Sequence, residues 1–338
     1  MAEVRRAALP VGLIGLGKHG VRYLAHLRSE VPELRLVAIS RKDAARGAAQ
    51  AAELGVAFHA DPVELVADPA VRAVIAVVPP VEHARIVAAA AREGKPLLIE
   101  KPFAVSVRDA IAQRAALAER GVPCMVAHTL RFSPVVRELR ARLELIGRPS
   151  QMVLGQSFEP TRLGWLDDPA ESGGGNILHT GVHMFDLLRH VTGGEVESVS
   201  CAIERVTTKK TEDSFAASMT VALADGGPKL LATVAGSRAT HSRYGELRIL
   251  GERGQLFADH VHGRVVLIED RRETELARLA DEPTVLAVLR EFVAVATAGA
   301  TPSITPDDGL AAVAIAEACY RSAESGRRVA VWPREDVP

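Results

Sequence analysis

Residues 11–124 alternate short apolar runs with amphipathic segments of helical length. The apolar runs predict strands at Val11–Gly15, Leu34–Ser40, Val71–Val78, Leu97–Glu100 and Pro123–Ala127. The segments between them predict helices at His19–Ser29, Ala44–Leu54, Glu82–Glu93 and Val107–Arg120. Strands that alternate with helices of this length imply parallel pairing through crossover connections. We therefore expect an α/β domain with a parallel, doubly wound sheet over residues 1–124.

The pattern changes after about residue 124, where strand-like segments follow one another without intervening helices. Many of them alternate polar and apolar residues, which is typical of an antiparallel sheet with one packed and one solvent-facing side. The predicted strands are Met152–Phe158, Val196–Val206, Ser214–Leu223, Lys229–Ser237, Gly245–Leu250, Gly254–Ala258 and Arg264–Glu269. The predicted helices are Pro134–Leu145, Ile177–Val191, Pro283–Ala298 and Asp307–Ser325. We expect residues 125–338 to form an α+β domain with a large, open, mainly antiparallel sheet.

The composition of the chain argues against several classes of binding partner and of structural site. The chain is 48% hydrophobic and 25% charged, with a formal net charge of −1, so it lacks the basic excess of nucleic-acid-binding proteins. Its three cysteines are far apart, which argues against a disulfide framework or a cysteine-rich zinc site. No apolar run approaches the length of a membrane helix, and the N-terminus does not resemble a secretion signal. We therefore expect a cytoplasmic protein.

A glycine-rich turn, with the pattern G-x-G-x-x-G, follows the first predicted strand and opens a helix. It consists of Gly15, Gly17 and Gly20, with Lys18 and His19 between the last two. The first glycine permits a tight turn, the second lets a pyrophosphate approach the backbone, and the third lets helix and strand pack closely. The pyrophosphate then lies at the helix N-terminus, where unpaired N–H groups favour negative charge. This context predicts a dinucleotide-binding Rossmann domain.

The end of the second predicted strand bears on the choice of dinucleotide. An acidic residue that binds the adenosine ribose usually stands there, but this chain has Ser40, Arg41 and Lys42. A carboxylate repels a 2′-phosphate, whereas arginine and lysine attract one. Because one charge-assisted hydrogen bond contributes about 1.5–3 kcal/mol, we expect NADP(H) to be preferred, with NAD(H) possible.

Glu100, Lys101 and Pro102 follow the fourth predicted strand, where open α/β sheets bind ligands. Lys101 there is placed to reach a substrate oxygen near the nicotinamide, and Glu100 to hold its ammonium group. The Lys101–Pro102 bond is a candidate for the cis form. Pro79 and His83 follow the third strand and are further candidates for cofactor contact, although His83 is equally suited to starting a helix.

The segment after Gly173, Gly174 and Gly175 carries a polar stripe. His179, His183, Asp186 and His190 fall at i, i+4, i+7 and i+11, on one side of a predicted helix. The stripe can face the substrate with His183 as proton donor or acceptor, since histidine titrates near neutral pH. Two alternatives are a zinc site and an ordinary polar helix face. We expect no metal, because no other cluster of ligands is evident.

These motifs together resemble the Gfo/Idh/MocA oxidoreductases, named for glucose–fructose oxidoreductase, inositol dehydrogenase and a rhizopine-catabolism protein. The matching pieces span both halves of the chain: Gly15–Gly20, Pro79-Pro80 with His83, Gly94-Lys95, Glu100-Lys101-Pro102, Arg131-Phe132, and Gly173-Gly174-Gly175 with His183 and Asp186. The resemblance implies that Lys101 assists proton transfer, that His183 is the catalytic histidine and Asp186 the carboxylate after it, and that the protein forms a homodimer or homotetramer.

The resemblance also implies roles for residues around the substrate. Arg131 is expected either near the substrate or supporting the active-site loop. His179 stands where sugar and polyol dehydrogenases often carry aspartate, which puts a standard inositol or glucose specificity in doubt. Arg162 and Trp165 lie in a polar loop that is equally suited to covering a sugar and to forming an oligomer contact.

The predicted activity is hydride transfer between NADP(H) and a carbonyl or secondary alcohol of a sugar- or polyol-like molecule. Lys101, supported by His183, would move the hydroxyl proton. Two alternatives stay open at this stage: a dinucleotide-binding regulator without turnover, and a reductase of a non-sugar substrate such as a dihydrodiol or an imine.

Overall fold

The computed structural model describes residues 7–161 and 163–332. Its contacts divide the described chain into two units. The first contains residues up to 104, 108–127 and 283–310, and the second contains 105–107, 128–282 and residues from 311 onward. The predicted domain boundary follows residue 124, whereas the contacts divide the chain after residue 127. In addition, residues 283–310 belong to the first unit, although they were predicted to lie in the second domain.

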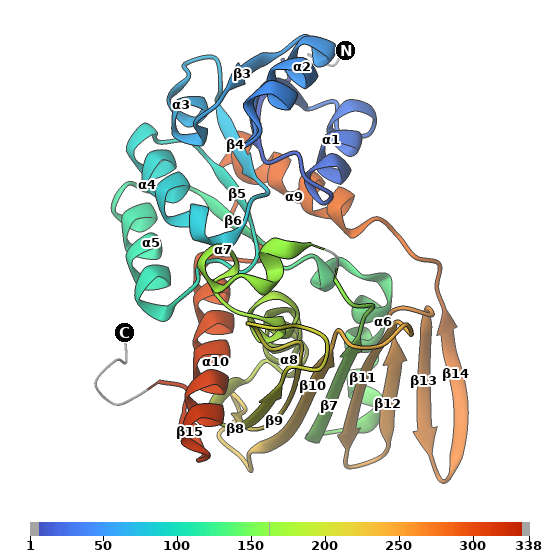
Figure 1. Ribbon diagram of the computed structural model, residues 1–338. Coiled ribbons are helices and arrows are strands. Elements are labelled where there is room, and N and C mark those ends of the chain that lie inside the picture. The colour runs from blue at the N-terminus through green and yellow to red at the C-terminus, as the bar shows by residue number, and fades with distance from the viewer. Residues whose placement is uncertain (1–6, 162, 333–338) are drawn as a thin grey trace, which may run out of the picture. The chain divides into compact units, whose positions relative to one another are not determined.

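The first unit contains a sheet of six parallel strands in the order β3-β2-β1-β4-β5-β6 (Figure 1). The strands are β1 Leu9–Ile14, β2 Leu34–Ser40, β3 Ala57–His59, β4 Ala73–Ala76, β5 Leu97–Glu100 and β6 Cys124–Ala127. The helices are α1 Gly20–Ser29, α2 Ala44–Leu54, α3 Pro62–Ala67, α4 His83–Glu93, α5 Val107–Glu119 and α9 Thr284–Ala298. The strand order reverses direction between β1 and β4, which is the point where doubly wound sheets bind ligands.

The predicted parallel sheet is confirmed. The residues of β4, β5 and β6 are all buried, because a parallel sheet is covered by helices on both faces. Two elements were not predicted, strand β3 and helix α3. Helix α3 has a recognisable start, since Asp61 caps it by accepting from the Val63 N–H at 2.8 Å and Pro62 occupies its first turn.

The second unit contains a nine-stranded sheet in the order β14-β13-β12-β11-β7-β10-β9-β8-β15. The strands are β7 Pro149–Ser157, β8 Glu195–Glu204, β9 Ser214–Ala222, β10 Leu230–Ser237, β11 Tyr244–Gly251, β12 Gln255–Asp259, β13 Arg264–Glu269, β14 Arg272–Arg278 and β15 Val329–Ala330. Only β7 and β10 pair in parallel among these described strands, so the sheet is mainly antiparallel as predicted. Strands β14 and β15 were not predicted.

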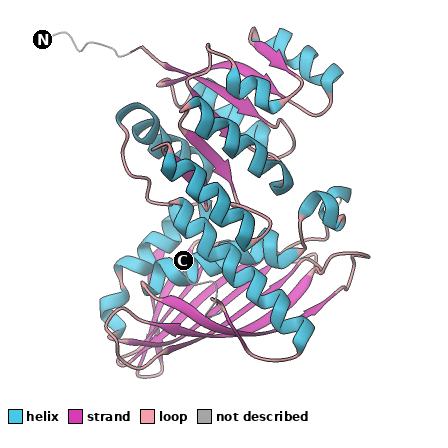
Figure 2. Cartoon of the chain, turned by 90° about the vertical axis from the view of Figure 1, so that its left-hand side faces the viewer, coloured by secondary structure: helices cyan, strands magenta, loops and turns pink. Residues whose placement is uncertain are grey.

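Helices of the second unit cover one side of this sheet (Figure 2). They are α6 Pro134–Ala141, α7 Pro169–Ser172, α8 Val182–Thr192 and α10 Pro306–Ser325, which begins in the first unit. Short helical turns are η2 Thr129–Phe132, η3 Leu143–Ile146 and η4 Gly164–Asp167, and η5 Ile177–Gly181 is a π-helical segment that leads into α8. Along β9 and β10 buried and exposed residues alternate, so the opposite side of these strands faces solvent.

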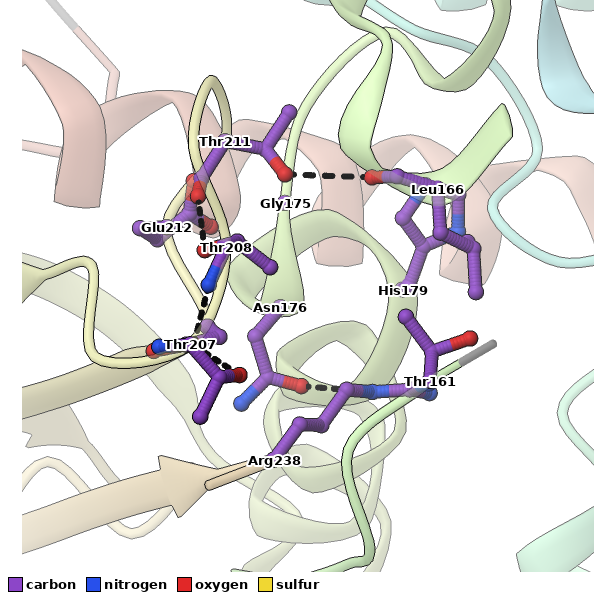
Figure 3. A pocket seen from close by; sticks show the side chains of 11 residues that line it. Thr161, Leu166, Gly175, Asn176, His179, Thr207, Thr208, Thr211, Glu212 and Arg238 are labelled. Carbon is purple, nitrogen blue, oxygen red and sulfur yellow. Dashed lines mark hydrogen bonds between the residues drawn. The ribbon is translucent and has the colours of Figure 1, made fainter. Parts of the chain in front are cut away.

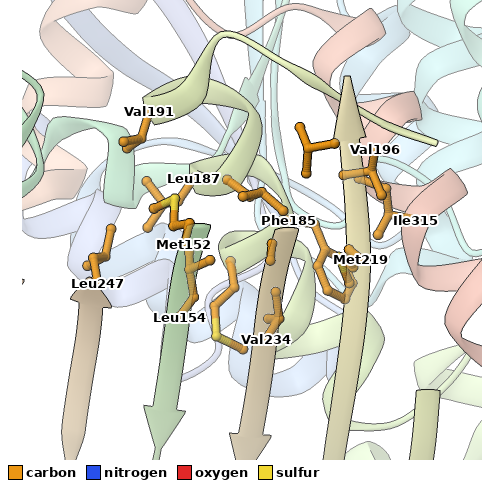
Figure 4. Close-up of a cluster of buried hydrophobic side chains, with 14 of the residues drawn as sticks. Met152, Leu154, Phe185, Leu187, Val191, Val196, Met219, Val234, Leu247 and Ile315 are labelled. Carbon is orange, nitrogen blue, oxygen red and sulfur yellow. The ribbon is translucent and has the colours of Figure 1, made fainter. Parts of the chain in front are cut away.

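The core of the second unit lies between its sheet and helices α8 and α10 (Figure 4). Phe185 and Leu187 of α8 meet apolar side chains of the sheet, among them Met152, Leu154 and Val234. Each fully buried side chain of this size stabilises the fold by about 1.5–3 kcal/mol. This packing fixes α8, and with it the polar residues that α8 carries.

Candidate functional site

The glycine-rich turn has the geometry of a dinucleotide cradle. Gly15 has a φ of +90°, and a Cβ there would lie 2.1 Å from the Val77 carbonyl oxygen. A Cβ at Gly20 would lie 1.9 Å from the Gly15 carbonyl oxygen, so the start of α1 packs directly on the turn. A Cβ at Gly17 would meet nothing within 4 Å. The two outer glycines are therefore required by packing, while the middle one leaves the open approach that a pyrophosphate needs.

Glu100, the last residue of β5, is hydrogen-bonded to His19 of the glycine-rich turn and to Tyr23 of α1. Its Oε1 accepts hydrogen bonds from Tyr23 Oη at 2.6 Å and from His19 Nε2 at 2.8 Å, and its Oε2 accepts from the Lys101 N–H at 3.2 Å. Burial disfavours the charged carboxylate, but the hydrogen bond and charge of His19, the charge of Lys101 and the Tyr23 hydroxyl outweigh it and hold the pKa of Glu100 at about 2. Glu100 is thus an anchor for the glycine-rich turn, and Tyr23 is a functional partner that the sequence analysis missed.

Tyr23→Phe is expected to lower the free energy of unfolding by about 1.5–3 kcal/mol, the usual contribution of a hydrogen bond to a charged group. The reason is that Tyr23 is fully buried, and its loss leaves the buried Glu100 carboxylate with one donor fewer. Urea unfolding measures this change, with Tyr244→Phe as the matched control because Tyr244 is only partly buried and its ring lies tilted against the exposed His262. Equal stability of the two variants would contradict the assignment.

The three residues at the end of β2 that were predicted together as cofactor contacts differ in their burial and in their hydrogen-bond partners. Ser40 is buried in the strand, and its carbonyl oxygen accepts from the Gly15 N–H at 2.9 Å. Arg41 Nη1 donates to the Leu16 carbonyl oxygen at 2.9 Å and to Gln50 Oε1 at 2.8 Å, so Arg41 is fastened to the glycine-rich turn. Lys42 is exposed beside the start of α2. Of these three residues, Lys42 has the exposed charge that a 2′-phosphate requires.

Pro79 and His83 follow β4, at the point where the strand order reverses. Pro79 precedes the short turn η1 Pro80–Glu82, and His83 begins α4. The His83 ring is fully buried, with Nδ1 3.3 Å from the Phe103 carbonyl oxygen and Nε2 3.3 Å from the Val78 carbonyl oxygen. Burial lowers the pKa of His83, so its neutral form is favoured. We assign His83 to positioning the loop after β4 against the Glu-Lys-Pro turn, which matches the alternative of a helix-starting histidine.

Lys101 lies in the first unit, directly after β5, and is partly buried. The Lys101–Pro102 peptide is cis, as the sequence suggested. His183, His179, Arg131, Asp186 and Trp165 belong to the second unit. The convergence of Lys101 with His183 therefore stays a prediction, and each half of the site is described by itself.

Arg131 and Asp186 form a buried ion pair within the second unit. Arg131 Nε lies 2.8 Å from Asp186 Oδ2, and Arg131 Nη2 lies 2.5 Å from Asp186 Oδ1. Only 9% of the arginine side chain and 1% of the aspartate side chain are exposed. Arg131 was expected either near the substrate or supporting the active-site loop, and the pair favours the second alternative by holding η2 against α8. Substrate contact by Arg131 or Asp186 stays a prediction.

The histidines of the predicted helix face different neighbours. His179 lies in the π-helical segment η5, with its ring edge-on to Trp165 at 5.4 Å between ring centres. His183 lies in the first turn of α8, with its ring edge-on to His128 at 6.0 Å. The predicted single helix over Ile177–Val191 is thus two segments. His128 is a buried neighbour of the site that the sequence analysis missed.

The three consecutive glycines are required by close packing. A Cβ at Gly173 would lie 2.5 Å from the Val105 side chain, one at Gly174 would lie 2.6 Å from Tyr320 Oη, and one at Gly175 would lie 2.1 Å from the Glu212 carbonyl oxygen. The loop before β9 therefore lies directly against the start of η5. Glu212 Oε1 accepts from Tyr320 Oη and from the Ile177 N–H, both at 2.9 Å.

The polar loop with Trp165 is fastened to the loop before β9. The Asp167 carboxylate accepts backbone N–H bonds from Thr211, Lys210 and Lys209 at 2.8–3.0 Å, which lower the pKa of Asp167 to about 2. Arg162 lies outside the described residues. Trp165 itself is partly buried against His179, so this part of the loop is ordered onto the polar end of η5.

A cavity of about 20 Å³ lies between these loops, η5 and the end of β10 (Figure 3). Its wall includes His179, Asn176 and Arg238. Among the described residues no group of three or more histidine, cysteine or acidic side chains is placed to hold a metal ion. Within the same residues, no helix combines the length and apolar character that crossing a membrane requires.

Two family models match the chain. An oxidoreductase family with an NAD-binding Rossmann fold, Gfo/Idh/MocA, matches residues 9–128. The C-terminal alpha/beta domain of the same oxidoreductase family matches residues 146–331. Together these matches cover both sheets.

Similar proteins support the same assignment. Inositol 2-dehydrogenase 1 of Saccharopolyspora erythraea is 31% identical over 345 residues, covering 95% of this chain and 96% of that enzyme. The 1,5-anhydro-D-fructose reductase of Ensifer adhaerens is 38% identical over 161 residues, covering 46% and 48%. The crystal structure of a probable dehydrogenase from Thermotoga maritima superposes with a TM-score of 0.81 at 25% identity, covering 97% of this chain and 100% of that one. With its nucleotide-binding turn and both matching domains, this chain belongs to the Gfo/Idh/MocA family, the NAD(P)-dependent oxidoreductases that act on CH–OH groups.

Proposed function

We propose that this protein transfers hydride between NADP(H) and a secondary alcohol or carbonyl of a sugar- or polyol-like molecule. Lys101 is the proton donor and acceptor, with His183 in support. The observation that carries this proposal is the hydrogen-bonded link between the glycine-rich turn and Glu100, the residue before Lys101. It fixes a lysine at the edge of the sheet where the dinucleotide is expected.

The residues divide the chemistry between them. When bound, the nicotinamide supplies or accepts the hydride. The backbone of Gly17 and the start of α1 hold the pyrophosphate, and Glu100 holds His19 beside it. Lys101 takes the hydroxyl proton on oxidation and returns it on reduction, with His183 in support.

The substrate class rests on the relatives, whose names state inositol and an anhydro-sugar as substrates. A panel of polyols, aldoses, ketoses and inosose-type ketones, assayed with NADP⁺ or NADPH at 340 nm, tests it. Turnover of at least one of them is the expected result. Tight NADPH binding without turnover of any compound would instead favour a dinucleotide-binding regulator, and turnover of only dihydrodiols or imines would favour a non-sugar reductase.

NADP⁺ is expected to exceed NAD⁺ in kcat/KM by about ten- to a hundredfold, because one phosphate contact contributes about 1.5–3 kcal/mol. Lys42→Ala should remove most of this preference by lowering kcat/KM for NADP⁺ alone. Arg35→Ala is the matched control, since Arg35 is an exposed cation near the opposite end of β2. Equal use of both dinucleotides by the unaltered protein would overturn the preference.

A further inference from the structure

The cavity of the second unit has an unusual arginine in its wall. Arg238 follows β10 and extends toward Asn176 and Thr161 (Figure 3). Its Nε donates to Asn176 Oδ1 and to Thr180 Oγ1, both at 3.1 Å. Its guanidinium carbon lies 5.6 Å from the centre of the Phe158 ring. The side chain is therefore held on two sides and partly buried.

Arg238 forms no ion pair with a carboxylate among the residues that the structure describes. Burial, followed by the charge of nearby Arg243, lowers the pKa of Arg238, and no acidic group opposes this shift. Arg243, which stacks on the same Phe158 ring, is paired with Glu159 at 2.8 Å. Removing a cation from water without a partner is costly, so an uncompensated guanidinium in a cavity wall indicates that an anion binds there.

The acidic residues in the same wall are already engaged elsewhere. The Asp213 carboxylate accepts N–H bonds from Val206, Thr207 and Thr208 at 2.6–3.1 Å. The Glu212 carboxylate accepts from Tyr320 and from the backbone of Ile177, and burial raises its pKa. Neither carboxylate therefore neutralises Arg238.

Two neutral residues of the cavity wall, Asn176 and Thr161, lie beside Arg238 (Figure 3). Asn176 is 2% exposed, and within the described chain its Nδ2 has no hydrogen-bond partner. Because Arg238 Nε can only donate, Oδ1 of Asn176 must face it, and the amide nitrogen lies on the side of Gly236 in β10. Thr161 Oγ1 accepts from the Leu163 N–H at 3.1 Å, so its hydroxyl hydrogen is available for donation.

We propose that Arg238, positioned by Asn176 and with the Thr161 hydroxyl as a second donor, forms an anion-binding subsite that takes a carboxylate of the substrate. The inference rests on the proposed function for its statement that the anion belongs to the substrate. It narrows the substrate class to acidic sugars and polyols, such as uronic or aldonic acids. A planar guanidinium can donate in parallel from two nitrogens, and this geometry matches a carboxylate.

Calorimetric titration of the NADPH-saturated protein with glucuronate, glucose and inorganic phosphate tests the subsite directly. Glucuronate is expected to bind about ten- to a hundredfold more tightly than glucose, as one charge-assisted contact implies. Arg238→Met should abolish the difference. Arg238→Gln keeps a donor for Asn176 and Thr180 but lacks the charge, and it should do the same while remaining folded. Arg243→Met, the matched control, should preserve the difference.

These titrations, together with the turnover assays at 340 nm, separate the possible failures. Tighter binding of glucuronate that depends on Arg238 supports the subsite even if no compound is turned over, in which case only the proposed activity fails. Turnover of neutral sugars with no preference for glucuronate would overturn the subsite and leave the activity standing. Binding of phosphate but not glucuronate would overturn the assignment to a carboxylate.

Discussion

Lys101→Met is expected to lower turnover by about two to four decades while NADPH still binds, since this is the usual contribution of a positioned general acid or base. Methionine keeps the length of the side chain but cannot carry a proton. The dinucleotide cradle should survive, because Glu100 holds His19 and Tyr23 through its own carboxylate. Stopped-flow or steady-state assays at 340 nm measure turnover, and fluorescence titration with NADPH measures binding.

A second substitution of Lys101 separates the loss of proton transfer from the loss of positive charge. Lys101→Arg keeps a cation for substrate binding but does not release its proton at neutral pH, so kcat should fall while KM changes little. Lys229→Met is the control for loss of a surface lysine, since Lys229 pairs with Glu197 at an exposed position. Unaltered turnover in Lys101→Met would refute the role of this lysine.

The first sheet could be predicted from the sequence because its strands are buried on both faces and stand out as apolar runs. Val74, Ile75 and their neighbours in β5 are all buried. Strand β3, at three residues, is too short to produce such a run. Helix α3 was predictable from Asp61 and Pro62, which are a typical helix start, but its six residues carry little periodicity.

Edge strands of the second sheet explain the other omissions. Strand β14 reads Arg-Glu-Thr-Glu-Leu-Ala-Arg and is mostly exposed, because an edge strand packs against a neighbour on one side only. Charged edges of this kind discourage pairing with other chains, and they remove the apolar alternation that identifies a strand. The π-helical segment before α8 was not predicted either, and it begins beside the long-range contact between Gly175 and Glu212.

The candidate site likewise contains features that local sequence predicts and features that it does not. The glycine-rich turn and the position of Lys101 follow from local sequence, because strand ends and glycine spacing are local. The hydrogen-bond partners within the site were not predictable, because they lie far apart along the chain. Tyr23 and Glu100 are 77 residues apart, and Arg238 and Asn176 are 62 residues apart. A long-range contact also positions Arg41, whose Nη1 donates to the Leu16 carbonyl oxygen in the glycine-rich turn, while its expected contact with the cofactor stays a prediction.

Arg131→Met is expected to lower the free energy of unfolding by about 3–5 kcal/mol, the usual cost of leaving one charge of a buried pair alone. Asp186 is 1% exposed and meets two nitrogens of the arginine, so no solvent can replace the lost partner. Urea or guanidinium unfolding measures the change. Arg142→Met is the matched control, because Arg142 pairs with Glu138 at the surface, where such pairs contribute little.

A double-mutant cycle decides whether the pair stabilises the fold or mainly sets its geometry. Arg131→Met combined with Asp186→Leu removes both charges, and such replacements are often neutral or stabilising. The double variant should therefore be more stable than Arg131→Met alone. If it is also less active than the unaltered protein, the pair serves to hold η2 and the first turns of α8, and hence His183, in place. A double variant as unstable as the single one would show that the cost comes from lost packing rather than from an unpaired carboxylate.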